Sequence, residues 1–176
     1  MALEGTLADC ADVHRRPAVR RQRGILYGSS VVALAVLLGL SFAGTYGVQS
    51  RTVRAEEGPL ALTVRYGSVS RPALATPFDI EVRRTGGFDG PVTVAITGEY
   101  LRMWDENGLL PAPASETTEG PWLVWEFDPP EGDALRVTYD ARIEPAAQEG
   151  RSGTVAVLDG DDEVVVEVAF TTRVWP

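Results

Sequence analysis

The feature that most constrains this chain is a run from Gly24 to Ser50 that contains no charged side chain. Its apolar centre extends from Ile25 to Ala43, and arginines lie on both sides. A transmembrane helix needs about 20 mostly apolar residues to cross roughly 30 Å of hydrocarbon. We therefore predict one membrane-spanning helix. The predicted organisation is a short disordered arm over 1–23, the helix over 24–48, a polar stalk over 49–59 and an outer domain over 60–176.

The placement of arginines predicts the orientation of this helix. Arg15, Arg16, Arg20, Arg21 and Arg23 precede the run closely, whereas only Arg51 and Arg54 follow it closely. Positive charge near a span favours the cytoplasmic side. The expected location is therefore the cell membrane, with a cytoplasmic N-terminus and an extracytoplasmic C-terminal domain.

A cleaved signal peptide is the alternative interpretation of the same run. Val31 to Leu40 has the length of the apolar region of such a peptide, and Ser41-Phe42-Ala43 resembles a small-x-small cleavage site. The apolar region continues past Ala43, and the leader before it is long. These two features favour a retained anchor.

Small residues recur along the run at spacings of four or seven, which places them on one helix face. Small residues allow a second helix to approach closely in lipid. The pattern predicts packing against a multi-pass membrane protein or against a second copy of this chain. The alternative is that Gly and Ala are simply frequent in such spans. The residues are Gly28, Ala35, Gly39, Ala43 and Gly47.

The charge of the outer part argues against nucleic acid as a partner. From Arg51 onward the chain has 11 arginines and 22 acidic residues, which gives a net charge of −11. Such a domain repels phosphate backbones. Cys10 and His14, each the only residue of its type, lie in the arm, and lysine is absent from the sequence.

Alternation of apolar and polar residues predicts strands throughout the outer domain. The clearest case is 135–144, where odd-numbered residues are apolar and even-numbered residues are polar. A period of two separates the two faces of a strand. The same pattern predicts six more strands, within 60–66, 78–83, 92–96, 122–127, 155–157 and 164–174.

Seven short strands separated by Gly, Pro and Asp turns predict an all-β fold, a seven-stranded antiparallel sandwich. Asp159-Gly160 between the last two strands predicts a hairpin. Its acidic neighbours lack the spacing of an EF-hand, so we expect a solvated turn and neither metal nor cofactor. In strand pattern, Leu60 to Trp175 resembles the immunoglobulin-like modules of bacterial envelope proteins, although it has no Cys-Trp-Cys framework.

A segment over 105–121 interrupts this rhythm and is predicted to be a long loop. Long loops in compact domains are often functional. The aromatic residues that flank it, Tyr100, Trp104 and Trp122, form a candidate binding surface. The alternative, which we favour, is that these rings close one end of the core.

The outer domain offers little for catalysis. It has no histidine, cysteine or lysine, which excludes Ser-His, Cys-His and lysine nucleophile systems and the usual zinc ligand sets. We expect no enzyme activity and no catalytic or metal-binding residue. The sequence favours an accessory or interaction subunit of a membrane complex. The alternative is an envelope binding or adhesion module that presents the 105–121 loop to a glycan, peptide or protein.

Overall fold

A computed structural model describes residues 17–42 and 47–175, and within the first range it describes side chains from Tyr27 to Ser41. The chain divides into two compact units, Met1–Tyr46 and Gly47–Pro176. In their described residues, the first contains one helix, and the second contains a β-sandwich with one short helix.

The helix of the first unit, α1 (Pro17–Phe42), is displaced from its predicted range of 24–48. It begins inside the expected disordered arm, at Pro17, because proline suits the first position of a helix, where its missing N–H is not needed. It ends at Phe42, and Gly47 lies in a bend of the second unit. No helix in the described part of the chain is both long and apolar enough to cross a membrane.

Ten strands form the second unit in the described residues, rather than the predicted seven. All seven predicted strands are present, and the additional ones are β1, β5 and β6. The strands are β1 (Gln49–Glu57), β2 (Leu60–Ser70), β3 (Phe78–Arg84), β4 (Val92–Thr97), β5 (Trp104–Leu110), β6 (Ser115–Glu119), β7 (Trp122–Phe127), β8 (Ala134–Ile143), β9 (Arg151–Leu158) and β10 (Val164–Val174). The short helix α2 (Gly98–Leu101) lies between β4 and β5.

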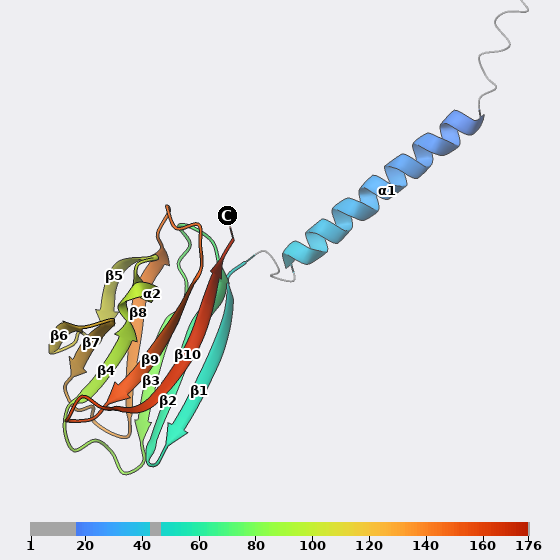
Figure 1. Cartoon of the computed structure of the whole chain (residues 1–176). Helices are drawn as coiled ribbons and strands as arrows, with labels where there is room; N and C mark the ends of the chain where they lie inside the picture. Colours follow the sequence, from blue (N-terminus) through green and yellow to red (C-terminus); the bar gives the residue numbers. More distant parts are fainter. Residues whose placement is uncertain (1–16, 43–46, 176) are drawn as a thin grey trace, which may run out of the picture. The chain divides into compact units, whose positions relative to one another are not determined.

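The strands form the two layers of a sandwich (Figure 1). The first sheet has the order β1-β2-β3-β8-β5, and the second has the order β10-β9-β4-β7-β6. Neighbours within each sheet are antiparallel. The sheets are joined where the end of β10 pairs in parallel with Val69 and Ser70 of β2. The predicted all-β antiparallel sandwich is thus confirmed.

The predicted stalk over 49–59 is wrong, because most of it is strand β1. This strand pairs with β2 along its whole length, from Gln49 opposite Val69 to Glu57 opposite Leu60. A two-residue turn of Gly58 and Pro59 joins them, and Gly58 has a φ of 55°. A glycine in this conformation followed by proline, whose φ is fixed near −65°, suits a tight hairpin.

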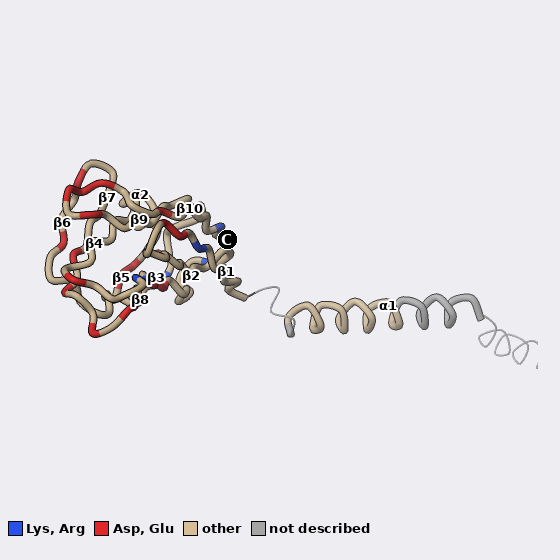
Figure 2. Tube along the Cα trace, turned by 90° about the horizontal axis from the view of Figure 1, so that it is seen from below, with Lys and Arg blue, Asp and Glu red and all other residues tan. Residues whose placement is uncertain are grey.

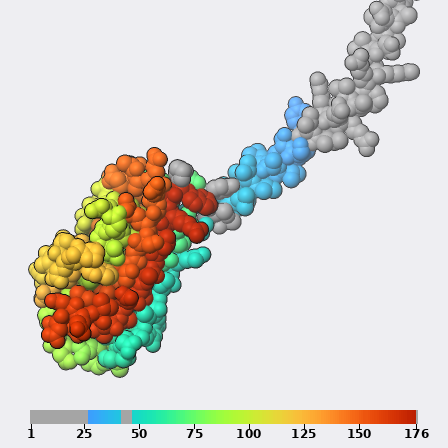
Figure 3. All heavy atoms as spheres, viewed as in Figure 1, coloured from blue at the N-terminus to red at the C-terminus, as the bar shows by residue number. Residues whose placement is uncertain are grey.

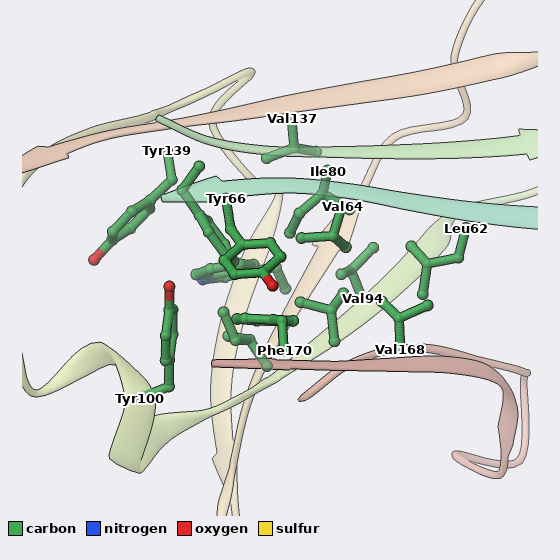
Figure 4. Close-up of a cluster of buried hydrophobic side chains, with 14 of the residues drawn as sticks. Leu62, Val64, Tyr66, Ile80, Val94, Tyr100, Val137, Tyr139, Val168 and Phe170 are labelled. Atoms are coloured by element: carbon green, nitrogen blue, oxygen red, sulfur yellow. The ribbon is translucent and has the colours of Figure 1, made fainter. Parts of the chain in front are cut away.

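The core lies between the two sheets and is built from the inward face of each strand (Figure 4). In β8 the predicted alternation holds for every residue from Leu135 to Ile143, with odd-numbered side chains buried and even-numbered ones exposed. Leu62, Val64, Ile80 and Val94 are almost completely buried in the same cluster. Burial of such side chains is the main stabilising term for a domain without disulfides.

Candidate functional site

Two of the three predicted surface aromatics are buried, so they do not form a binding surface. Tyr100 on α2 is 0% exposed and Trp104 on β5 is 7% exposed. Tyr100 meets Phe170 edge-on at 4.9 Å between ring centroids, and Trp104 lies 5.8 Å from Tyr100. Trp122, on β7, is half-buried, and within the described residues its ring does not pack against either of them. The rings of Tyr100 and Trp104 close one end of the core, as the alternative interpretation expected.

A hydrogen-bond chain fixes Tyr100 between the two layers. Its hydroxyl lies 2.9 Å from Oγ1 of Thr172 on β10, and this Oγ1 donates to the carbonyl of Gly67 on β2 at 2.7 Å. Burial raises the pKa of the Tyr100 hydroxyl, and the hydrogen bond with Thr172 offsets only part of this effect. The group therefore stays protonated and structural, which makes it unsuitable as a general base.

The segment over 105–121 is not a loop, so the predicted long loop at this place is wrong. It contains most of β5 and all of β6, the edge strands of the first and second sheets. A hairpin turn at Gly120, with a φ of 57°, joins β6 to β7. In Figure 3 the stretch around residues 110–120 (yellow-orange) projects at one margin of the sandwich. Leu110, the last residue of β5, is 73% exposed.

Two carboxylates tie this segment to the core. Glu106 on β5 accepts a hydrogen bond from the Tyr139 hydroxyl at 3.1 Å, and Glu116 on β6 accepts one from the Trp125 indole N–H at 2.8 Å. Burial and the nearby Glu106 and Glu116 raise the pKa of Tyr139. The segment that the sequence predicted to be a loop is therefore anchored to the core by two hydrogen bonds.

The outer face of the first sheet carries a lattice of paired charges. Glu81 on β3 pairs with Arg83 on its own strand and with Arg136 on β8, the latter at 3.1 Å. Asp79 pairs with Arg65 on β2 at 3.2 Å. Partial burial tends to raise the pKa of Glu81, but hydrogen bonds from Arg83 and Arg136 outweigh it and hold the pKa below its usual value.

A shallow hollow of about 310 Å³ lies within this lattice, lined by Arg65, Asp79, Glu81 and Arg136 among others. Its guanidinium and carboxylate groups already satisfy one another. The sequence shows these residues on the polar faces of their strands, but the pairing across strands depends on the register between β3 and β8. Sequence reasoning therefore missed this face, and only the outward position of its charges was available as a signal.

The predicted helix-packing residues fall into three groups. Gly28, Ala35 and Gly39 lie on α1 with exposed positions. Ala43 lies outside the described residues. Gly47 lies beyond α1, where the second unit begins, and so does not share its helix face. The described part of the stripe is thus Gly28, Ala35 and Gly39.

Among the described residues, no group of three or more His, Cys, Asp or Glu side chains is arranged to hold a metal ion. Of the polar ring groups near the core, those of Tyr100, Tyr139 and Trp125 each form a hydrogen bond, whereas the buried indole N–H of Trp104 has no hydrogen-bond partner within the described residues. The surface presents paired charges on the first sheet and the exposed edge strands β5 and β6.

Comparison with known proteins gives likenesses to solved structures but no match in sequence. No protein-family model and no curated protein matches the sequence. Among solved structures, the chain is similar to a non-cellulosomal cohesin from the hyperthermophilic archaeon Archaeoglobus fulgidus. The identity is 16% and the TM-score 0.35, over 65% of this chain and 91% of the cohesin. The sandwich described above rests on its own strand pairing and not on this likeness.

Proposed function

We propose that this chain is a non-catalytic, single-pass membrane protein whose extracytoplasmic sandwich is an accessory or interaction subunit of a membrane complex. The observation that carries the proposal is the apolar surface of α1. Tyr27, Val31, Leu34 and Leu38 are each more than half exposed, as are Val32, Val36 and Leu37. These residues surround the helix rather than forming one stripe. A helix that is apolar all round is stable only when lipid or protein covers it.

The sequence beyond the helix supports the same proposal. The uncharged run continues past Phe42 to Ser50, so the stretch available to a bilayer extends beyond the part of α1 whose side chains are described. The five arginines from Arg15 to Arg23 favour a cytoplasmic N-terminus. The resemblance of the strand pattern to immunoglobulin-like envelope modules fits a sandwich on the outer side.

The small residues of α1 suggest where a partner helix would pack. Gly28, Ala35 and Gly39 lie along one face, and Gly39 has open space around its Cα, with nothing within 4 Å of an added Cβ. Such a surface lets two backbones approach until dispersion and weak hydrogen bonds hold them. The partner is another membrane helix, from a multi-pass protein or from a second copy of this chain.

Substitution of Gly39 by Leu tests this proposal. The added side chain would separate the two helices, so we expect at least a several-fold loss of co-purified partner or of dimer from mild-detergent extracts. Ala33→Leu is the matched control, because at 100° per residue Ala33 lies about 120° around the helix from Gly39, away from the face of the small residues. Equal recovery of the complex from both variants and the wild type would contradict helix packing.

A second candidate function is a binding module that uses the β5–β6 margin of the sandwich. It is favoured by the exposed Leu110 and by two adjoining edge strands, whose free backbone groups accept a further strand. Leu110→Ser should lower binding to envelope extracts while the domain stays folded. Leu74→Ser is the control, since Leu74 is also exposed, at 41%, but lies in another loop.

A further inference from the structure

Most arginines of the sandwich form ion pairs, but a few do not. Of the 11 arginines from Arg51 onward, eight form an ion pair with Asp or Glu. Arg51, Arg71 and Arg173 form none within the described residues. In a domain with twice as many acidic as basic residues, three arginines without a carboxylate partner need an explanation.

All three unpaired arginines lie at one end of the sandwich, which we name the arginine end. It is the end where β1 begins and β10 finishes. Arg173 pairs in register with Val69 of β2, Arg71 follows β2 directly, and Arg51 lies opposite Tyr66 of β2. Figure 2 shows basic segments of the trace gathered near β1, β10 and the C-terminus. The acidic turn from Asp159 to Glu163 lies at the opposite ends of β9 and β10, whereas Glu149, two residues before β9, lies at the arginine end.

Two of these arginines face a common hollow of about 420 Å³ between β1 and β10. Gln49 and Arg51 line it from β1, and Thr171 and Arg173 line it from β10, with Ser68 of β2 between them. Both arginine side chains belong to exposed residues, so they are accessible to a ligand. None of the lining residues in this described part of the chain is acidic.

The hollow has a rigid base. Tyr66 and Phe170 contribute to its lining, and their rings lie 5.1 Å apart between centroids. The Ser68 hydroxyl donates to the carbonyl of Gln49 at 3.1 Å, which ties β1 to β2 at this point. The strands that carry the two arginines are thus both held to β2. A guanidinium held on a fixed strand loses less entropy when it binds a ligand.

We propose that this hollow binds a phosphate group. One arginine fork satisfies both oxygens of a carboxylate, whereas two forks from different strands match a group with three or more anionic oxygens. The amide of Gln49 adds a further donor. The phosphate could come from a phosphomonoester lipid headgroup, as in phosphatidic acid, or from a free phosphate, since both offer at least three terminal oxygens. Binding of a phosphate group goes beyond the proposed function. Only a lipid source of the phosphate rests on the proposed function.

The test uses the full-length chain in a neutral detergent. All four tryptophans lie in the sandwich, so their fluorescence follows its thermal unfolding. We expect inorganic phosphate at ten times its Kd to raise the Tm by about 4 °C over chloride of equal ionic strength. In a second arm, phosphatidic acid, whose headgroup is a phosphomonoester, is compared with phosphatidylcholine in mixed micelles. A rise with the lipid alone identifies a headgroup, and a rise with inorganic phosphate identifies a free phosphate.

Variants tie the effect to the hollow. The rise should disappear in R51Q/R173Q and persist in R65Q/R136Q, which removes the same charge from the first sheet. R51K/R173K retains the charge without the forks and should keep a reduced rise, which gives a second measure if the glutamine variant does not fold. The proposal is overturned if neither source raises the Tm, or if R51Q/R173Q responds as the wild type does. Either result leaves the outcome of the Gly39 experiment unchanged.

Discussion

Gly153 and Tyr100 determine how closely β9 and α2 approach. A Cβ added to Gly153 would lie 2.7 Å from Cγ and 2.8 Å from Cβ of Tyr100. Tyr100 cannot retreat easily, because its ring is buried against Phe170 and its hydroxyl is hydrogen-bonded to Thr172. Glycine is required at this position by contact with a neighbouring side chain and not by a left-handed backbone.

We predict that Gly153→Ala lowers the free energy of unfolding by about 1–3 kcal/mol, the usual cost of overpacking a filled core. Urea unfolding followed by tryptophan fluorescence measures this difference. Gly90→Ala is the control, since a Cβ at Gly90 meets nothing within 4 Å. It should change stability by no more than about 0.5 kcal/mol. A variant G153A as stable as G90A would show that Tyr100 has room to move.

Individual residues were predictable from the sequence where one strand decides their environment. The burial of Val137, Tyr139 and Ala141 follows from alternation within β8 alone. The burial of Trp104 does not, because it depends on contacts with Tyr100 and Phe78 from other elements. The same limit applies to Glu106, which meets Tyr139 across 33 positions of sequence. A candidate surface inferred from aromatic residues near a supposed loop was therefore unreliable.

At the scale of elements, strands with a buried face were predictable and edge strands were not. All five residues of β6 are exposed, and β1 has only Val53 and Ala55 half-buried. Such strands form because their backbone groups pair with a neighbour, and pairing leaves no hydrophobic period in the sequence. This explains why the stalk and the long loop were predicted in place of β1, β5 and β6. It also means that removal of 105–121 would delete the edge of both sheets rather than an appendage.

At the scale of the whole chain, the distribution of charge bears on both the proposed membrane tether and the proposed phosphate site. Paired charges cover the outer face of the first sheet, whereas unpaired arginines gather at the arginine end. The chain enters the sandwich at that end, through Gly47 and Gln49, which belong to the last part of the uncharged run. Of the three unpaired arginines of the described sandwich, Arg51 directly follows this run in sequence, and Arg71 and Arg173 lie at the same end of the strands. A membrane tether and a phosphate site are thus mutually consistent, although each is tested separately.

The acid stability of the sandwich depends on Glu81. Its pKa is held below the usual value in the folded state, so the carboxylate stabilises the fold above its unfolded pKa, near 4.3. This contribution is lost as the pH falls through the lowered folded pKa. We expect Glu81→Gln to reduce the free energy of unfolding by less than about 1 kcal/mol at pH 7, because the arginine partners are largely exposed. Urea unfolding from pH 7 to pH 3 should show the free energies of unfolding of the two proteins converging at low pH.

In an Arg83→Gln/Arg136→Gln background, Glu81→Gln should have a smaller effect on the free energy of unfolding, since the donors that lower the pKa of Glu81 are gone. Unfolding curves that stay equally separated at every pH would rule out this role for Glu81.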